Sequence, residues 1–572
     1  MLIDAETLQE NQVLQADFAV VGAGPAGIVL SLELAKAGHS VALLESGQLD
    51  FAETNQALGD ADQFDPNFHA PMDECTRRQL GGTSTIWGGR CVPYDPVDFD
   101  RRDYVANADW PVTYDELTPY FQRACDYFFC GNAEFDLHQI SGVEQASIVP
   151  GLPDGHVLTS VIERWSLPTN FGKEYFKQLQ QSEKISLYYG LTCTNIETVE
   201  AGNQVLSLQA KTLGAKKLTV KARKYILAGG ALNTTRLLMA SDQQHPGGIG
   251  NHSGLLGRFY MGHLSGDIAA IQFTTPPDKT IFGFDRDEAN IYLRRRFSFT
   301  REFQHEKNLT NVVSWLGAPP FGDPGHGSGV FSLAFLALSS PFGKYLAAKA
   351  IRDTAIGQDK KDFYWKHIHN VLNDLFKTIA FAPKFGYQRY IAKRRIPALF
   401  MYSASNEYPL HYHAEQVPNF DSRISLSDQT DALGMRKINI DLRYCDQDID
   451  SVVRAHQYWD DYLRKHNCGY LKYFNDDPVS SVWEQAGDGF HQNGTTRMSE
   501  HARDGVVGSN CNVHNFDDLF VASSSIFVTS GQANSTFMIV AFALKLADFL
   551  NSKLVKSPAS STVSPVTLRS QN

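Results

Sequence analysis

Little in this chain of 572 residues points to a metal-bound, disulfide-linked or membrane-spanning protein. Its eight cysteines include no CxxC pair, which excludes the common zinc and dithiol motifs and favours reduced thiols. The longest apolar stretch, residues 330–338, is far shorter than the roughly 20 residues that a membrane-spanning helix needs. We therefore expect neither a bound metal nor a transmembrane segment.

Positive charge is also in short supply. The net charge of −11 repels phosphate backbones, so nucleic acid is excluded as a general partner and a small-molecule substrate is favoured. Residues 1–16 lack the basic start and apolar centre of a signal peptide, so we expect a cytoplasmic protein. The hydrophobic content of 43% is that of a globular protein, and the length predicts more than one domain.

The first glycine cluster lies in a predicted strand–turn–helix–strand unit over residues 17–47. The turn reads Gly22-Ala23-Gly24-Pro25-Ala26-Gly27, where bare backbone and a helix N-terminus can approach a pyrophosphate. Glu45 follows at the end of the next strand, about 20 residues on, where a carboxylate can bind a ribose diol. The unit predicts binding of FAD or NAD, and disfavours NADP.

Two further glycine-rich segments follow. Residues 81–90 read Gly-Gly-Thr-Ser-Thr-Ile-Trp-Gly-Gly-Arg, which combines close backbone approach with hydroxyl groups and could receive a flat heteroaromatic ring. Residues 224–240 read as a strand, then Gly229-Gly230, then a helix, and predict a second strand-to-helix turn against a ligand. Strand-like alternation over 255–330 and 400–445 predicts an antiparallel sheet.

The last cluster is C-terminal. Residues 490–498 read Phe-His-Gln-Asn-Gly-Thr-Thr-Arg-Met, and residues 531–536 read Gly-Gln-Ala-Asn-Ser-Thr and open an apolar helix that reaches Leu550. The clusters at 22–27, at 81–90 and at the C-terminus, in this order and over nearly the whole chain, resemble the glucose–methanol–choline (GMC) flavoprotein oxidoreductases. Residues 164–172 and 415–423 resemble the bacterial branch near pyranose oxidase and related sugar-oxidising flavoproteins.

This resemblance implies an α/β fold with a Rossmann-like FAD domain and a substrate domain that contains an antiparallel sheet and a helical insertion. It also implies an alcohol oxidoreductase, a dehydrogenase or oxidase, with His491 and Asn534 as the catalytic pair. The implied FAD contacts are Gly22, Gly24, Pro25, Ala26, Gly27, Glu45, Ser46, Gly82, Thr83, Trp87, Gly88, Gly89, the main chain at Cys193, Ala228, Gly229, Ser523, Ser524, Ser535 and Thr536.

The chain departs from the family pattern at several positions. Ser523 stands where an acid is common, Val528 replaces a proline, and Asn534-Ser535-Thr536 replaces Asn-Pro-Thr. These changes put the cofactor contacts at Ser523 in question. Ile86 stands where covalently flavinylated relatives have histidine, so we expect FAD to be bound non-covalently.

A histidine suits the implied reaction because hydride removal from an alcohol carbon becomes feasible as the hydroxyl proton leaves. A neutral imidazole is a suitable acceptor for that proton near neutral pH. His491 would take the proton, Asn534 would orient the hydroxyl, and the hydride would pass to flavin nitrogen N5. His411 and His413 alternate along one predicted strand, and without a third ligand at metal spacing we interpret them as a polar strand face.

Residues 344–396 form a basic segment with twelve Lys or Arg and four Asp or Glu, interleaved with apolar residues at helical spacing. The favoured interpretation is a solvated helical insertion. The alternatives are a docking surface for an acidic electron acceptor and an amphipathic region on an anionic membrane.

The predicted FAD domain comprises residues 1–95, 186–265 and 485–555. The predicted substrate domain comprises 96–185 and 266–484 with the helical insertion at 331–400, and 556–572 form a disordered tail. The expected partners are an alcohol, with a sugar, glycoside or polyol favoured, and oxygen, a quinone or another redox carrier as electron acceptor. The alternative is a flavoprotein of the same fold with non-redox or light-driven chemistry, such as a hydroxynitrile lyase or a decarboxylase.

Overall fold

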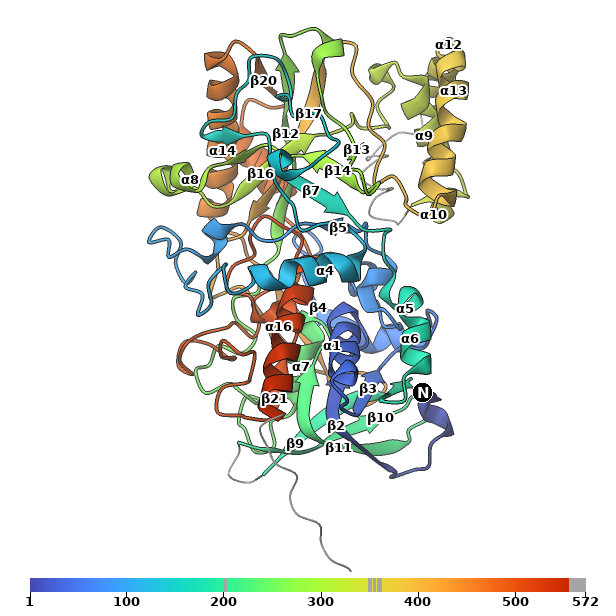
Figure 1. Cartoon of the computed structure of the whole chain (residues 1–572), viewed down its shortest axis with the longest axis vertical. Helices are drawn as coiled ribbons and strands as arrows, with labels where there is room; N and C mark the ends of the chain where they lie inside the picture. Colours follow the sequence, from blue (N-terminus) through green and yellow to red (C-terminus); the bar gives the residue numbers. More distant parts are fainter. Residues whose placement is uncertain (200–202, 348–351, 353–355, 357–362, 555–572) are drawn as a thin grey trace, which may run out of the picture.

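The computed structural model describes residues 1–199, 203–347, 352, 356 and 363–554. The chain folds into two lobes stacked along the long axis of the molecule, each with its own central sheet (Figure 1). A single cluster of buried apolar side chains continues through both lobes, from Phe18 in the lower lobe to Trp459 in the upper one. The predicted tail at 556–572 lies outside the described residues.

The lower lobe contains an eight-stranded sheet. Strands β1 (Leu2–Asp4), β8 (Ile185–Tyr189), β3 (Val41–Glu45), β2 (Val13–Val21) and β11 (Lys217–Leu227) are parallel neighbours, and β21 (Leu519–Val521) also pairs with β11. Strands β10 (Val205–Lys211) and β9 (Thr192–Thr198) complete it as antiparallel neighbours. Because its strands come from the two ends and the middle of the chain, the sheet assembles only when distant segments meet.

Three helices of this lobe are central to the site. Helix α1 (Pro25–Lys36) follows β2, α7 (Ala231–Ala240) follows β11, and α16 (Thr536–Leu554) packs against α1 (Figure 1). Both strand-to-helix turns predicted from the sequence are present. The N-termini of α1 and α7 therefore lie at the carboxyl ends of parallel strands, the position at which α/β sheets bind ligands.

The upper lobe has an antiparallel sheet in the order β16 (Val312–Leu316), β17 (Glu407–Glu415), β12 (His263–Phe273) and β20 (Gly469–Tyr473). Helices α14 (Asp446–Lys465) and α15 (Pro478–Gln485) pack on it. The antiparallel sheet expected from the alternating pattern is thus present. Two smaller sheets stand beside it: β13 (Asp285–Arg286), β14 (Tyr292–Arg295), β7 (Ile162–Trp165) and β5 (Arg90–Cys91), and the pair β15 (Ser298–Phe299) with β6 (Val157–Leu158).

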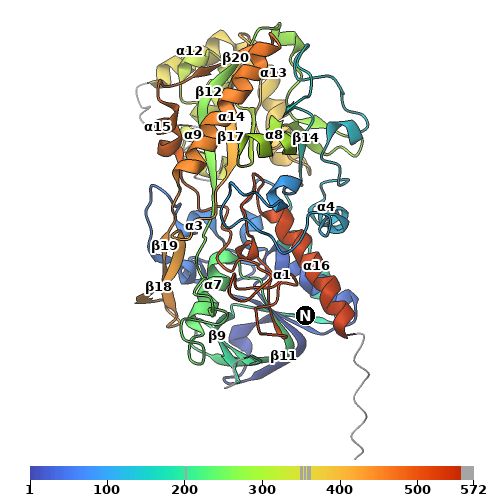
Figure 2. The same cartoon turned by 90° about the vertical axis from the view of Figure 1, so that its left-hand side faces the viewer.

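One hairpin lies apart from that sheet. Strand β19 (Arg436–Asp441) pairs with both β18 (Arg423–Thr430) and β4 (Ala61–Gln63), and β18 and β19 contact α7 in the lower lobe (Figure 2). Our domain ranges assign this hairpin to the substrate domain, whereas its partners belong to segments assigned to the FAD domain. The ranges themselves stay a prediction.

The helical insertion predicted at 331–400 contains α9 (Gly329–Ser339), α10 (Gly343–Leu346), α12 (Tyr364–Asn373), α13 (Leu375–Gly386) and a π-helical turn at Tyr387–Ile391. Residues 392–400 are not helical. The other short helices are α2 (Glu53–Gln56), α3 (Met72–Cys75), α4 (Phe121–Phe128), α5 (Phe171–Glu174), α6 (Phe176–Gln181) and α8 (Arg301–Lys307). Among the described residues, no helix is long and apolar enough to span a bilayer.

Candidate active site

The glycine turns at 22–27, 81–90 and 229–230 meet at one cleft in the lower lobe. Gly22 has a φ of +105°, and a Cβ there would lie 2.6 Å from the carbonyl oxygen of Ala228 and 2.8 Å from the Cα of Gly229. A Cβ on Gly82 would come within 3.1 Å of the Cα of Gly24. Because only glycine permits such backbone approach, these positions fix the three segments around a common space.

The first turn of α1 faces this space. Gly24 is the N-cap residue and supplies no side chain, so the N–H groups of the first turn have no capping acceptor. A Cβ on Gly24 would meet no atom within 4 Å, because it would project into the open cleft. Gly27 lets helix and strand pack instead, since a Cβ there would lie 1.9 Å from the carbonyl oxygen of Gly22.

Glu45 is buried at the end of β3. One carboxylate oxygen accepts from the N–H of Ala23 at 2.8 Å, and the other accepts from the N–H of Gly47 at 2.7 Å. Burial raises the pKa of Glu45, and the two backbone hydrogen bonds oppose that rise. The glutamate therefore ties the glycine turn to the cleft wall and keeps oxygen lone pairs for a further donor.

The cleft brings together most of the residues predicted to bind the cofactor. Its lining includes Gly22, Gly24, Pro25, Ala26, Glu45, Ser46, Gly82, Thr83, Trp87, Cys193, Ala228, Gly229, Ser523, Ser524, Ser535, Thr536 and also His491. Four predicted site residues do not line it, namely Gly27, Gly88, Gly89 and Asn534. Gly88 is exposed, and Gly89 packs against Ser166 and Pro168 instead.

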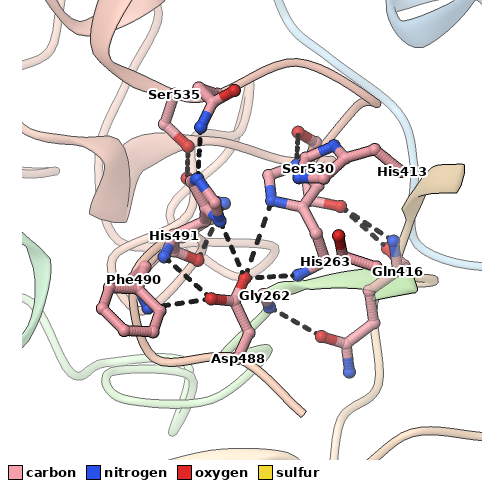
Figure 3. Close-up of polar contacts among 12 residues, drawn as sticks. Gly262, His263, His413, Gln416, Asp488, Phe490, His491, Ser530 and Ser535 are labelled. Carbon is pink, nitrogen blue, oxygen red and sulfur yellow. Dashed lines mark hydrogen bonds and ion pairs between the residues drawn. The ribbon is translucent and has the colours of Figure 1, made fainter. Parts of the chain in front are cut away.

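His491 lines the cleft and has a partner on each ring nitrogen (Figure 3). Nε2 lies 2.5 Å from Nδ2 of Asn534, and Nδ1 lies 3.0 Å from Oδ2 of Asp488. The carboxylate accepts from Nδ1–H, so Nε2 carries the lone pair that the amide of Asn534 contacts. The two residues predicted as a pair from the sequence are therefore in contact.

Asp488 holds this arrangement from a buried position. Its Oδ1 accepts from the N–H of Phe490 at 2.8 Å, and its Oδ2 accepts from the N–H of His263 at 2.8 Å. Burial alone would raise the pKa of Asp488, but the imidazoles of His491 and His263 hold it well below the usual range. Asp488 is thus an ionised carboxylate behind the histidine.

Two more histidines complete the cluster from the upper sheet. The ring of His263, at the start of β12, lies 4.7 Å from that of His491, and the ring of His413 on β17 lies 4.4 Å from that of His263. One nitrogen of each donates to the backbone: Nε2 of His263 to Ser530 and Nδ1 of His413 to Gln532. Burial lowers the pKa of both groups, so both are neutral at physiological pH.

The sequence interpretation of His411 and His413 as a polar strand face holds only for His411. The side chain of His411 is half-buried against Trp315, whereas His413 points into the cluster. Nitrogen atoms of His263, His413 and His491 all lie within 4.8 Å of one another, a spacing that a metal ion could also use. We expected no metal, and that expectation stays a prediction.

Comparison with protein families finds two matches. The C-terminal model described as GMC oxidoreductase matches residues 418–543, and the model described as FAD binding domain matches residues 17–67. The chain therefore carries a GMC oxidoreductase C-terminal domain and an FAD-binding segment. Both matched segments contribute to the cleft, since Gly22 and Glu45 lie in one and His491 and Ser535 in the other.

Two relatives match this chain over nearly its whole length. It is 22% identical to a 2-methyl-1,2-propanediol dehydrogenase of Mycolicibacterium austroafricanum, with 94% of this chain and 95% of that protein covered. It is also 22% identical to a 6'''-hydroxyparomomycin C oxidase of Streptomyces lividus, with 95% and 92% covered. The likeness to the branch near pyranose oxidase stays a prediction.

Solved structures share this fold. A formate oxidase of Aspergillus oryzae superimposes with a TM-score of 0.53 at 16% identity and covers 96% of this chain and 99% of its own. A fungal aryl-alcohol oxidase gives 0.51 at 14% identity, with 96% and 100% covered. At such identity the likeness concerns the fold alone.

FAD fits the chemistry of this cleft. The uncapped N-terminus of α1 offers N–H groups for a diphosphate, and α7 likewise begins at a glycine that supplies no capping side chain. Buried polar atoms beside the cleft lack a partner among the described residues, including Nε of Arg78, Oγ1 of Thr234 and Oδ1 of Asn534. A ligand that carries phosphates and hydroxyls would satisfy such groups.

Sequence reasoning missed Arg78. It is a half-buried cation in the cleft wall that donates to Oγ of Ser46 and to Oδ1 of Asn233, both at 2.6 Å. Burial lowers its pKa to about 10. Its position just before the second glycine cluster was the available signal, since a cation that precedes a ligand loop suits an anionic ligand. Asp488 and His263 were missed as well.

Proposed function

We propose that this protein is a GMC oxidoreductase that oxidises a CH–OH group of a sugar, glycoside or polyol to a carbonyl with non-covalently bound FAD. The names of its relatives support hydroxylated substrates, since they include a diol dehydrogenase, two aminoglycoside oxidases and a fructose dehydrogenase large subunit. Ile86, whose side chain cannot bond to a flavin, supports non-covalent binding. Oxygen, a quinone or another redox carrier would reoxidise the flavin.

The observation that carries the proposal is the pair of contacts on His491. With Nδ1–H held by Asp488 at 3.0 Å, the unprotonated Nε2 faces Asn534 at the cleft. An imidazole in this tautomer accepts a hydroxyl proton without first losing one. His263 and His413 are neutral and therefore place no positive charge beside His491. Such a charge would oppose the protonation of His491.

Three side chains and one helix N-terminus would act together in the proposed reaction. Bound FAD would accept the hydride of the alcohol carbon at its nitrogen N5. His491 would take the hydroxyl proton on Nε2, and Asp488 would stabilise the imidazolium that results. Asn534 would orient the substrate oxygen, because its Oδ1 is buried without a partner among the described residues. The first turn of α16, at Ser535 and Thr536, would place its positive dipole end at the cleft.

The remaining cleft residues would hold the cofactor. Gly22, Gly24 and the first turn of α1 would bind the diphosphate, and Glu45 would accept hydrogen bonds from the adenosine ribose. Arg78 would offset the diphosphate charge from the opposite wall. Gly88 and Gly89 have no part in this proposal, because neither lines the cleft.

Asp488→Asn is expected to lower kcat/KM about 10²–10⁴-fold, the usual contribution of a positioned base. The asparagine amide can donate to Nδ1 of His491, which moves the histidine proton to Nε2 and leaves no acceptor for the substrate. Removal of the negative charge also leaves the imidazolium that forms in the reaction without a counter-ion, so kcat should fall together with kcat/KM. Steady-state kinetics check both effects.

The matched control is Glu484→Gln, which removes an exposed acid on α15 and should leave kcat and kcat/KM unchanged. A purely structural role for Asp488 predicts a loss of thermal stability, with wild-type kcat and kcat/KM in the protein that remains folded. That outcome, or wild-type kinetics in Asp488→Asn, would contradict the assigned positioning role.

A further inference from the structure

The helical insertion turns its polar side toward the protein. Nδ1 of His367 on α12 lies 3.0 Å from Oγ of Ser332 on α9, and its ring stacks on Phe335 at 4.1 Å. Nδ2 of Asn370 donates to the carbonyl of Pro324 at 2.8 Å, and Thr378 on α13 is buried. Surface helices normally bury their apolar stripe, whereas α12 and α13 bury these polar side chains and leave Ile368 and Phe381 only half-buried.

The apolar side of the same two helices faces outward. Trp365 and Leu372 on α12 are 80% and 62% exposed, and Phe376 and Ile379 on α13 are 90% and 61% exposed. Helices α12 and α13 stand at the upper right edge of the molecule, in front of α9 (Figure 1). A group of large exposed apolar side chains on adjacent helices marks an interaction surface.

Positive charge surrounds this apolar side. Residues 363–396 contain seven Lys or Arg and only one acid, Asp374, in a chain whose net charge is −11. The exposed members of that set are Lys366, Lys377, Lys384, Lys393 and Arg395. We use the name docking surface for these five cations together with the four apolar side chains Trp365, Leu372, Phe376 and Ile379.

The charge of the docking surface selects its partner. A second copy that met it face to face would place like charges opposite each other. Residues 555–572 carry one Lys, one Arg and no acid, so the tail offers no complement. An acidic carrier protein would match the cations, but it would not explain four apolar side chains that are between 61% and 90% exposed. An anionic lipid bilayer has an apolar interior and negatively charged head groups, so it matches both the exposed apolar side chains and the cations.

We propose that the docking surface binds the face of an anionic lipid bilayer, with the apolar side chains among the acyl chains and the lysines and arginines at the head groups. This proposal goes beyond the oxidation proposed above and does not depend on it. The insertion connects β16 to β17, and β17 carries His413 of the active site. Docking would therefore hold the substrate lobe beside the bilayer.

The test is co-sedimentation of the full-length, FAD-loaded protein with vesicles. Vesicles of phosphatidylcholine with about a third phosphatidylglycerol should bind the protein at low salt, and pure phosphatidylcholine vesicles should bind it at least 10-fold less. High salt should weaken binding, since the cations are exposed and screened. The double variant Trp365→Ser/Phe376→Ser and the double variant Lys393→Glu/Arg395→Glu should each lower binding at least 10-fold.

Arg394 is left intact in the second variant because its guanidinium donates to the carbonyls of Trp165 and Phe129 and ties the insertion to the lobe. The control for the apolar variant is Leu206→Ser/Phe474→Ser, whose side chains are 53% and 52% exposed outside the insertion. Flavin absorbance and the midpoint of thermal unfolding should match wild type in every variant.

Absence of binding to anionic vesicles at low salt would overturn the proposal. Equal loss in the control double variant would overturn it too, because the docking surface would then have no special part. A stable dimer that Trp365→Ser/Phe376→Ser dissociates, seen by light scattering, would assign the docking surface to a second copy instead.

Discussion

Replacing His491 with alanine is expected to leave FAD bound and to slow its anaerobic reduction by the alcohol about 10²–10⁴-fold. His491 offers the unprotonated Nε2 that takes the hydroxyl proton, and a methyl group in its place offers no acceptor. The cofactor should remain, because the glycine turns and Glu45 that surround it do not depend on the imidazole. Stopped-flow absorbance of the flavin in the absence of oxygen measures the rate.

The control for this variant is His411→Ala. His411 belongs to the same strand as His413, but it lies outside the cluster and is half-buried against Trp315. Its removal should change flavin reduction by less than about 10-fold, the cost of a modest packing loss rather than of a lost base. Reduction at the wild-type rate in His491→Ala would show that another group takes the proton.

Gly24→Val is expected to weaken FAD binding about 100-fold without unfolding the protein. A Cβ at this position would enter open space, so the fold without FAD tolerates it. The added side chain would occupy the place of the diphosphate and break about two charge-assisted hydrogen bonds to the first turn of α1, at about 1.5 kcal/mol each. Fluorescence titration of FAD into apoprotein measures the affinity.

Gly88→Ala supplies the comparison. Gly88 belongs to the second glycine cluster, but it is exposed and an added Cβ would meet nothing within 4 Å. FAD affinity should be unchanged in this variant. If Gly24→Val bound FAD as tightly as wild type, the diphosphate could not lie at the start of α1, and the assigned orientation of the cofactor would be wrong.

The parts of the site that follow from local sequence were predictable. Gly22, Gly24, Gly27 and Glu45 fall within a single strand–turn–helix–strand unit, so their spacing alone places them. The pairing of His491 with Asn534 came from the family resemblance, since the two residues are far apart in the sequence. Their contact at 2.5 Å agrees with that pairing, whereas their catalytic roles stay a prediction.

The second half of the cluster depends on strand register, which the alternating pattern does not fix. His263 lies opposite Glu415, and His413 lies opposite Ser265, where β12 and β17 pair. A shift of one residue would turn His413 to the other face of the sheet. Asp488 meets His491 through a loop between α15 and the site, a conformation that no sequence period encodes.

The outward direction of the large apolar side chains of α12 and α13 could likewise not be predicted from the sequence. Helical spacing of apolar residues in 344–396 was visible, and the solvated insertion was the favoured interpretation because such a stripe normally packs inward. Two contacts orient α12: Ser332 on α9 bonds to His367, and the carbonyl of Pro324 accepts from Asn370. The exposed Trp365 and Phe376 are the consequence.

The most direct test of the proposed oxidation is anaerobic mixing of the FAD-loaded protein with a panel of sugars, glycosides, polyols and simple alcohols. At least one compound should bleach the visible flavin absorbance and yield one equivalent of its carbonyl product. A flavin that stays oxidised with every member of the panel, in protein that is folded and fully loaded, would contradict the proposal and favour non-redox or light-driven chemistry on this fold.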